Sequence, residues 1–153
     1  MIERYSRKEL KDIWSEENKY KIWLEVEIAA AEAMEKFKII PKGVSSIVKK
    51  KGKIKVKRIH DIEAKVKHDV IAFLTSITEQ AGIKARYLHQ GMTSSDVLDT
   101  SFNIQLMQSG KIILKDIDLS LIHISEPTRL LSMWECGVWV KKKRGGGGGG
   151  GGG

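Results

Sequence analysis

The sequence predicts an all-α fold, and three observations support that class. Apolar residues recur at three- and four-residue steps over long stretches, which is the period of an amphipathic helix. The first 118 residues contain one proline, five glycines and no cysteine, so few residues interrupt a helix. No stretch shows the strict apolar–polar alternation that is typical of a half-buried strand.

Composition also excludes several classes of protein. The only cysteine, Cys136, excludes a disulfide framework and fits a reducing compartment. No run approaches eighteen uncharged apolar residues, so we expect no membrane span. The first residues lack the apolar stretch of a secretory signal. We therefore expect a cytoplasmic protein with no membrane partner.

The first predicted helix is short and runs from Ser6 to about Trp14. Ser6 and Glu9 have the spacing of a capping box, in which two side chains satisfy backbone N–H groups at the helix start. Before it, Arg4 and Tyr5 place a guanidinium beside an aromatic ring. Such a pair can hold a phosphate and lie against a base.

A second helix is predicted from Ser15 to Phe37. Ser15 is a suitable N-cap, and the acidic residues that follow it suit the positive end of the helix dipole. Proline at position 41 disfavours further helix. The predicted apolar stripe consists of Ile22, Val26, Ala29, Ala33 and Phe37, and it is widened by Trp23, Ala30, Ala31 and Met34.

A third helix is predicted over residues 42–52, with Gly52 at its end. A lysine-rich run over Lys49–Lys57 follows. One interpretation is a phosphate-binding patch in a small nucleic-acid-binding module. The favoured interpretation is a solvated surface, because the run has no interleaved aromatic residues. We therefore expect no nucleic-acid partner.

A fourth helix is predicted as one continuous element from about Val56 to Gln80, and Gly82 closes it. His68 falls in the middle of this helix. Its imidazole could donate to a phosphate or transfer a proton, or it could be an ordinary histidine at the edge of the core. His60 has no histidine four residues away, so no metal site is predicted.

The last predicted helix begins near Ser95, after a loop that spans Arg86 to Ser94. In this loop Gly91 permits a close backbone approach, and hydroxyl residues stand where the helix opens. A helix N-terminus favours carboxylate or phosphate, so the loop could bind an anion beside His89. Alternatively, Thr93 and Asp96 form an ordinary N-cap pair.

Residues 119–153 form a segment of different character. Residues 119–129, LSLIHISEPTR, match the translation of a transposon-type sequencing adapter, and a basic run and nine glycines end the chain. We expect Leu119–Gly153 to be a non-native, disordered tail. The remaining residues 1–118 have a net charge of +5, from 22 basic and 17 acidic residues, against +8 for the whole chain.

Several segments occur together in an informative order. They are IERYS at residues 2–6, IWS at 13–15, WLEVE at 23–27, KHDVIAF at 67–73 and HQGMTSSDVLDT at 89–100. Together they resemble the N-terminal part of bacterial adenylosuccinate lyases, which belong to the fumarase/aspartase superfamily. The resemblance covers about residues 1–118, roughly a quarter of the usual length of that family.

The resemblance implies a fold and an activity. It implies an N-terminal helical domain over residues 1–93, the truncated first helix of a central bundle domain over 94–118, and the non-native tail over 119–153. It further implies a homotetramer without metal or organic cofactor, which eliminates fumarate from the nucleotide adenylosuccinate to give AMP. The same family cleaves an earlier ribotide of purine biosynthesis.

The resemblance also implies which residues form the site. His68 and His89 would be the catalytic residues of this segment, with His68 near the phosphate and supporting the acid. Thr93 and Ser94 would hold a carboxylate of the succinyl part. The implied substrate-binding residues are Arg4, Tyr5, Lys67, His68, Asp69, Thr93 and Ser94.

Two segments of the resembled family are missing here. The general acid lies in a Gly-Arg-Thr-His segment and the base on a Ser-Ser-x-Met-Pro loop, and neither occurs in this sequence. We therefore expect an incomplete and inactive chain. Two alternatives remain: another superfamily enzyme, such as an argininosuccinate lyase or a cycloisomerase, and the Lys-rich nucleic-acid-binding module.

Overall fold

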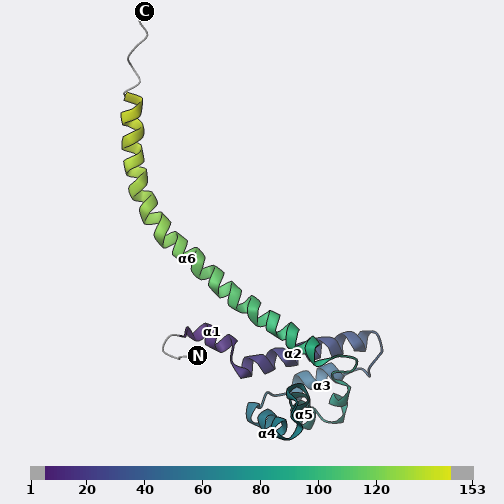
Figure 1. Ribbon diagram of the computed structural model, residues 1–153. Helices are drawn as coiled ribbons and strands as arrows, with labels where there is room; N and C mark the ends of the chain where they lie inside the picture. Colours follow the sequence, from purple (N-terminus) through teal and green to yellow (C-terminus); the bar gives the residue numbers. More distant parts are fainter. Residues whose placement is uncertain (1–5, 146–153) are drawn as a thin grey trace, which may run out of the picture. The chain divides into compact units, whose positions relative to one another are not determined.

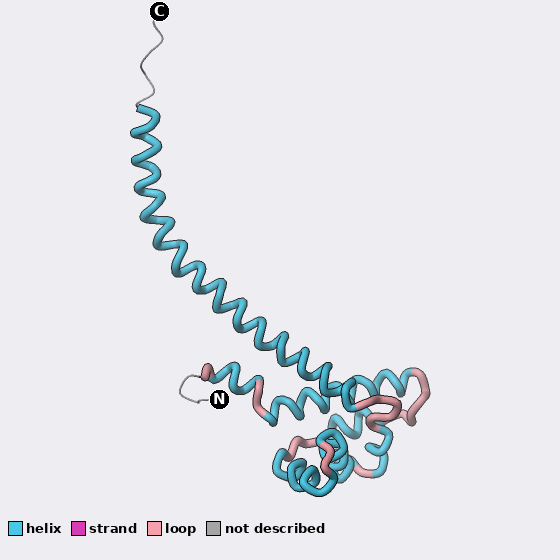
Figure 2. Tube along the Cα trace, viewed as in Figure 1, coloured by secondary structure: helices cyan, strands magenta, loops and turns pink. Residues whose placement is uncertain are grey.

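The structure is a computed structural model that describes the backbone of residues 6–145 and the side chains of residues 6–122. Within these ranges it contains helices and loops and no strand (Figures 1 and 2), which confirms the all-α class. The helices in chain order are α1 (Lys8–Ile13), α2 (Glu16–Lys36), α3 (Val44–Lys51), α4 (Val56–Val66), α5 (Asp69–Ala81), the short 3-10 helix η2 (Ile83–Tyr87) and α6 (Ser94–Gly145).

The chain forms two compact units, Met1–Ser109 and Gly110–Gly153. In the first unit α4 packs against α5, and α2 and α3 pack against each other. The described residues of the second unit, 110–145, belong to α6. The predicted division into residues 1–93, 94–118 and 119–153 stays a prediction.

Three aromatic rings form the centre of the core in the first unit. Tyr20 and Trp23 of α2 meet edge to face, with ring centroids 5.2 Å apart. Phe73 of α5 stacks on Tyr20 at 5.9 Å and meets Trp23 edge to face at 5.5 Å. All three side chains are buried, and burial of one large apolar side chain stabilises a fold by roughly 1.5–3 kcal/mol.

Two predicted helix ends are confirmed by their caps. The Ser15 Oγ accepts a hydrogen bond from the Asn18 backbone N–H at 3.2 Å, so Ser15 caps α2. Gly52 ends α3, where an added Cβ would lie 2.7 Å from the Val48 carbonyl oxygen. A larger residue would therefore displace the last turn of α3.

The predicted capping box of α1 is wrong. The helix begins at Lys8, and its N-cap is Arg7, which makes no side-chain capping bond. Glu9 is therefore one position too early to be the partner of a capping box, and its carboxylate lies 2.6 Å from the Arg7 guanidinium. The ion pair replaces the predicted contact.

The predicted apolar stripe of α2 is buried only in part, at Ile22, Trp23 and Ala31. Phe37 is 79% exposed, and Ala29 and Ala33 are also exposed. The buried residues of the helix are Tyr20, Ile22, Trp23, Glu27 and Ala31. The aromatic rings supply more apolar area than the alanines, so they determine which face is covered.

The predicted continuous helix over residues 56–80 is two helices. Lys67 has a left-handed backbone (φ 57°) and ends α4, and His68 is extended (φ −147°) and precedes α5. The apolar spacing continues across the break, which explains why periodicity predicts one helix. His68 is thus the N-cap of α5 rather than a residue in mid-helix.

Helix α6 continues to Gly145, further than the predicted boundary at Asp118 and into the segment predicted to be disordered. The leucines, glutamates and lysines of that segment favour helix by local propensity, irrespective of its origin. The glycines predicted to be disordered lie, after Gly145, outside the described residues. Among the described residues no helix is long and apolar enough to cross a membrane.

Candidate functional site

The predicted site residues lie in two places that the fold brings together. Lys67, His68 and Asp69 form the junction between α4 and α5, and His89, Thr93 and Ser94 belong to the loop that leads into α6. Arg4 and Tyr5 lie outside the described residues. The site is therefore built from two helix starts, those of α5 and α6.

His68 is held by the first turn of α5. Its Nδ1 accepts a hydrogen bond from the Ile71 backbone N–H at 3.4 Å, and the Asp69 carboxylate accepts one from the Val70 N–H at 2.7 Å. When Nδ1 accepts, the neutral ring carries its hydrogen on Nε2. The cap thereby directs a donor away from α5.

Nε2 of His68 meets the start of α6. It lies 3.5 Å from the Ser94 Oγ, although the two residues are 26 positions apart. The positive end of the helix dipole makes each helix start favourable for an anion, although the Val70 and Ile71 N–H groups of α5 already bond to side chains. Two such ends and an imidazole donor therefore converge at this contact.

Thr93 and Asp96 confirm the predicted N-cap pair of α6. The Asp96 carboxylate accepts hydrogen bonds from the Thr93 backbone N–H at 2.7 Å and from its hydroxyl at 3.1 Å. These bonds hold the pKa of Asp96 below its usual range, and the backbone bond is the main cause. A bound carboxylate would have to compete with Asp96 for the Thr93 hydroxyl.

His89 contacts a residue that sequence reasoning did not single out. The Glu27 carboxylate accepts a hydrogen bond from the His89 backbone N–H at 2.9 Å, and its other oxygen lies 2.6 Å from the His89 Nδ1. Glu27 is buried in the apolar face of α2. The sequence carried one signal for this role: Glu27 stands four residues after Trp23, and therefore on the same side of the helix.

Ser101 and Gln105 are further polar residues that the sequence did not reveal. Both are buried on α6. The Trp23 indole N–H donates to the Ser101 Oγ at 2.9 Å, and the Gln105 amide donates to the Ile13 carbonyl at 2.8 Å. These bonds fix the start of α6 and, with it, the position of Ser94.

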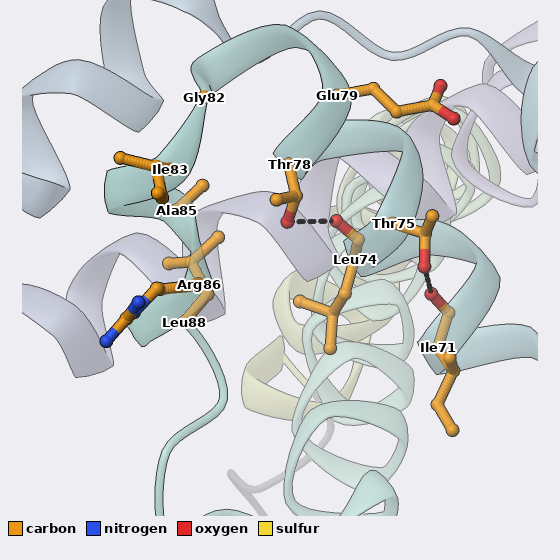
Figure 3. A pocket seen from close by; sticks show the side chains of 10 residues that line it. All are labelled: Ile71, Leu74, Thr75, Thr78, Glu79, Gly82, Ile83, Ala85, Arg86 and Leu88. Carbon is orange, nitrogen blue, oxygen red and sulfur yellow. Dashed lines mark hydrogen bonds between the residues drawn. The ribbon is translucent and has the colours of Figure 1, made fainter.

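A pocket of about 520 Å³ lies elsewhere in the first unit (Figure 3). Its threonine hydroxyls are occupied, because Thr75 donates to the Ile71 carbonyl at 2.7 Å and Thr78 to the Leu74 carbonyl at 2.8 Å. None of the predicted site residues lines it. Its remaining lining residues are Glu79, Gly82, Ile83, Ala85, Arg86 and Leu88.

The lysine-rich run is divided by the fold. Its first three lysines form the last turn of α3, where positive charge suits the helix dipole, and the rest lead into α4. This placement gives a structural role to Lys49, Lys50 and Lys51.

Three curated proteins are similar to this chain in sequence. The adenylosuccinate lyase of Thermotoga maritima is 46% identical over 117 residues, which are 76% of this chain and 27% of that protein. The Aquifex aeolicus adenylosuccinate lyase is 48% identical over 121 residues (77% and 28%). The Bacillus subtilis adenylosuccinate lyase is 40% identical over 129 residues (84% and 30%).

The chain thus spans less than a third of the length of these curated relatives. The fold is similar to that of a crystal structure, the fumarate lyase from Mesorhizobium sp. BNC1, with a TM-score of 0.66 and 22% identity. That similarity covers 71% of this chain and 26% of the other. No model of a protein family matches the chain.

Proposed function

We propose that this chain is the N-terminal part of an adenylosuccinate lyase. The complete enzyme would eliminate fumarate from adenylosuccinate to give AMP, and would cleave the succinyl-aminoimidazole carboxamide ribotide in the same way. Identities of 40–48% to three adenylosuccinate lyases support this proposal.

The contact between His68 and Ser94 is the structural observation that carries the proposal. The substrate of such an enzyme bears a phosphate and two carboxylates. The His68 Nε2 lies 3.5 Å from the Ser94 Oγ, where the starts of α5 and α6 meet. This arrangement is suited to binding one of these anions. The all-helical scaffold is also that of a fumarate lyase structure.

The proposed roles follow the chemistry of each side chain. Thr93 and Ser94 would hold a carboxylate of the succinyl part. His68 and His89 would be the catalytic residues of this segment, with His68 also near the phosphate. Arg4, Tyr5, Lys67 and Asp69 would complete the nucleotide contacts.

β-Elimination needs a base that removes the Cβ proton and an acid that protonates the leaving nitrogen. The segments expected to supply both are absent from this sequence. We therefore propose that the 153-residue chain is inactive alone and that the complete enzyme is a cytoplasmic homotetramer. It would need no metal or organic cofactor.

We also propose that the residues from about Leu119 onward derive from adapter sequence. The matches of 117 and 121 residues are close in length to the 118 residues before this segment, whereas the match of 129 residues extends into it. Sequencing genomic DNA past the codon for Asp118 tests the point. A genomic sequence that encodes LSLIHISEPTR would contradict it.

A chimaera tests the proposed activity. Residues 1–118 would replace the matching segment of the Thermotoga maritima adenylosuccinate lyase, and absorbance would follow the loss of adenylosuccinate. We expect turnover within about tenfold of the parent enzyme. His68→Gln should lower kcat/KM by about 10²- to 10⁴-fold, because that is the usual contribution of a proton-transferring group.

His60→Gln is the matched control. His60 is on α4 of the first unit, and its Nε2 lies 2.9 Å from the exposed Glu16 carboxylate. We expect this variant to keep the activity of the chimaera. A folded chimaera without activity, or an equal loss in both variants, would contradict the proposed function.

A further inference from the structure

Glu27 is a buried residue with a charged side chain, and the roles proposed so far do not include it. Its side chain has 0% exposure, whereas that of His89 keeps 19%. Glu27 stands on the same face of α2 as Trp23 and Ala31, which are completely buried. A carboxylate in such surroundings is costly unless it is hydrogen-bonded.

Both oxygens of Glu27 are directed at one residue, 62 positions away. One oxygen accepts the His89 backbone N–H at 2.9 Å, and the other lies 2.6 Å from the imidazole Nδ1. When the carboxylate is ionised it can only accept hydrogen bonds, and the hydrogen of this contact then lies on Nδ1. The other ring nitrogen, Nε2, forms no hydrogen bond with a described residue.

The backbone of His89 is adapted to this pairing. His89 has a left-handed conformation (φ 61°), which costs a residue with a side chain roughly 1–2 kcal/mol. In this conformation the N–H and the ring of His89 both contact the Glu27 carboxylate. His89 also lies close enough to the first turn of α6 to contribute to the lowered pKa of Asp96.

We infer that Glu27 is a positioning residue, which holds His89 in the Nδ1–H form and leaves Nε2 for a ligand. A neutral ring would accept a hydrogen bond at Nε2. A protonated ring would donate one there to an anion, while Glu27 balances its charge. The nature of that ligand rests on the proposed function; the state of the ring does not.

Nuclear magnetic resonance of the ¹⁵N-labelled 153-residue chain tests this inference without turnover. Long-range ¹H–¹⁵N spectra would be recorded at about pH 8.5, well above an unperturbed imidazole pKa of ~6.5. We expect a protonated Nδ1 for His89. We expect a protonated Nε2 for His60, because its Nε2 is 2.9 Å from Glu16 whereas its Nδ1 is 3.6 Å from Glu63. An unprotonated Nδ1 in His89, or an average of both tautomers, would overturn the inference.

Glu27→Gln should reverse the tautomer of His89. The amide has only one carbonyl oxygen, and if this accepts the backbone N–H, its NH₂ group must face Nδ1 as a donor. The ring would then accept at Nδ1 and carry its hydrogen on Nε2. Glu25→Gln, an exposed position two residues earlier, is the matched control and should leave the His89 signals unchanged.

The two variants separate positioning from stability. A purely structural role would lower the unfolding temperature of Glu27→Gln without changing the ring tautomer of its folded fraction, and that result would contradict the inference. If Glu27→Gln does not fold, the tautomer of the unsubstituted chain decides. Failure here leaves the lyase proposal intact, because the chimaera tests that by activity.

Discussion

Two candidate site residues have the backbone conformation that side chains normally avoid. Among the described residues other than glycine, Lys38, Lys67 and His89 have positive φ, at 60°, 57° and 61°. Strain of this kind persists where the surrounding structure maintains it, and it often marks functional sites. Lys67 places His68 at the start of α5, and Lys38 follows α2 on an exposed turn.

The matched pair Lys67→Gly and Lys38→Gly separates strain from function. Glycine removes the penalty of a left-handed conformation, so each variant should raise the free energy of unfolding by about 0.5–1 kcal/mol. Urea denaturation of the 153-residue chain measures this. In the chimaera only Lys67→Gly should lower kcat/KM, by about 10- to 100-fold, through loss of a substrate contact. Equal activity in both variants would remove Lys67 from the proposed site.

Substitution of two buried serines of α6 should have opposite effects on stability. Ser101→Ala removes the acceptor of the buried Trp23 N–H and should cost about 1–3 kcal/mol of stability, because the indole donor is left unpaired. The Ser109 hydroxyl is buried without a partner among the described residues, so Ser109→Ala should be neutral or stabilising. Urea denaturation compares them, and a larger loss for Ser109→Ala would contradict the packing described.

At the scale of elements, helix α3 is capped by another helix. The Glu35 carboxylate of α2 accepts hydrogen bonds from the backbone N–H groups of Ser45 at 2.7 Å and Gly43 at 3.1 Å. These bonds, chiefly that from Ser45, hold the pKa of Glu35 below its usual range. Because the folded pKa is lowered, the stabilisation is present above the unfolded pKa and is lost as pH falls through the folded pKa.

Glu35→Ala should therefore destabilise the chain by about 1 kcal/mol at pH 7, the usual cost of a lost cap. The difference from the unsubstituted chain should shrink as pH falls below the usual range of a glutamate pKa and the native carboxylate becomes protonated. Thermal unfolding over this pH range measures both effects. Glu32→Ala, an exposed position on the same helix, is the control, and an equal, pH-independent loss in both variants would exclude the cap.

The elements show what a sequence can and cannot predict. The bounds of α2 and α3 follow from Ser15 and Gly52, because caps and helix stops act on neighbouring residues. The break at Lys67 does not, because neither Gly nor Pro marks it and apolar spacing continues through Val66 and Val70. The break depends on a left-handed lysine and a histidine cap, and neither residue type is a common signal for these positions.

The candidate site was predictable to the extent that it is local. The pairing of Thr93 and Asp96 follows from their spacing. The approach of His68 to Ser94 and the burial of Glu27 against His89 require the packing of distant segments, which periodicity cannot supply. The family resemblance assembled the residues of the site without indicating Glu27.

At the scale of the whole molecule, α6 presents large apolar side chains to solvent. Leu106, Met107, Ile113, Leu114 and Ile117 are 45%, 61%, 49%, 63% and 48% exposed. Surface of this kind normally marks a place where another chain binds.

We therefore expect the 153-residue chain to associate and to bind a hydrophobic dye. Leu114→Lys should reduce both effects several-fold, because it places a charge on the exposed apolar surface. Sedimentation at rising concentration and dye fluorescence measure them. Thr100→Lys adds the same charge at a polar, exposed position and should change neither. A monomer that binds no dye would contradict the prediction.

The bonds between α6 and the first two helices have a consequence for biosynthesis. The partners of Trp23 and of the Ile13 carbonyl stand 78 and 92 positions later in the chain. A ribosome therefore releases α1 and α2 long before Ser101 and Gln105 exist to meet them. Until then the indole donor must remain with water, so the N-terminal helices should become protected from proteolysis only after the start of α6 has left the exit tunnel.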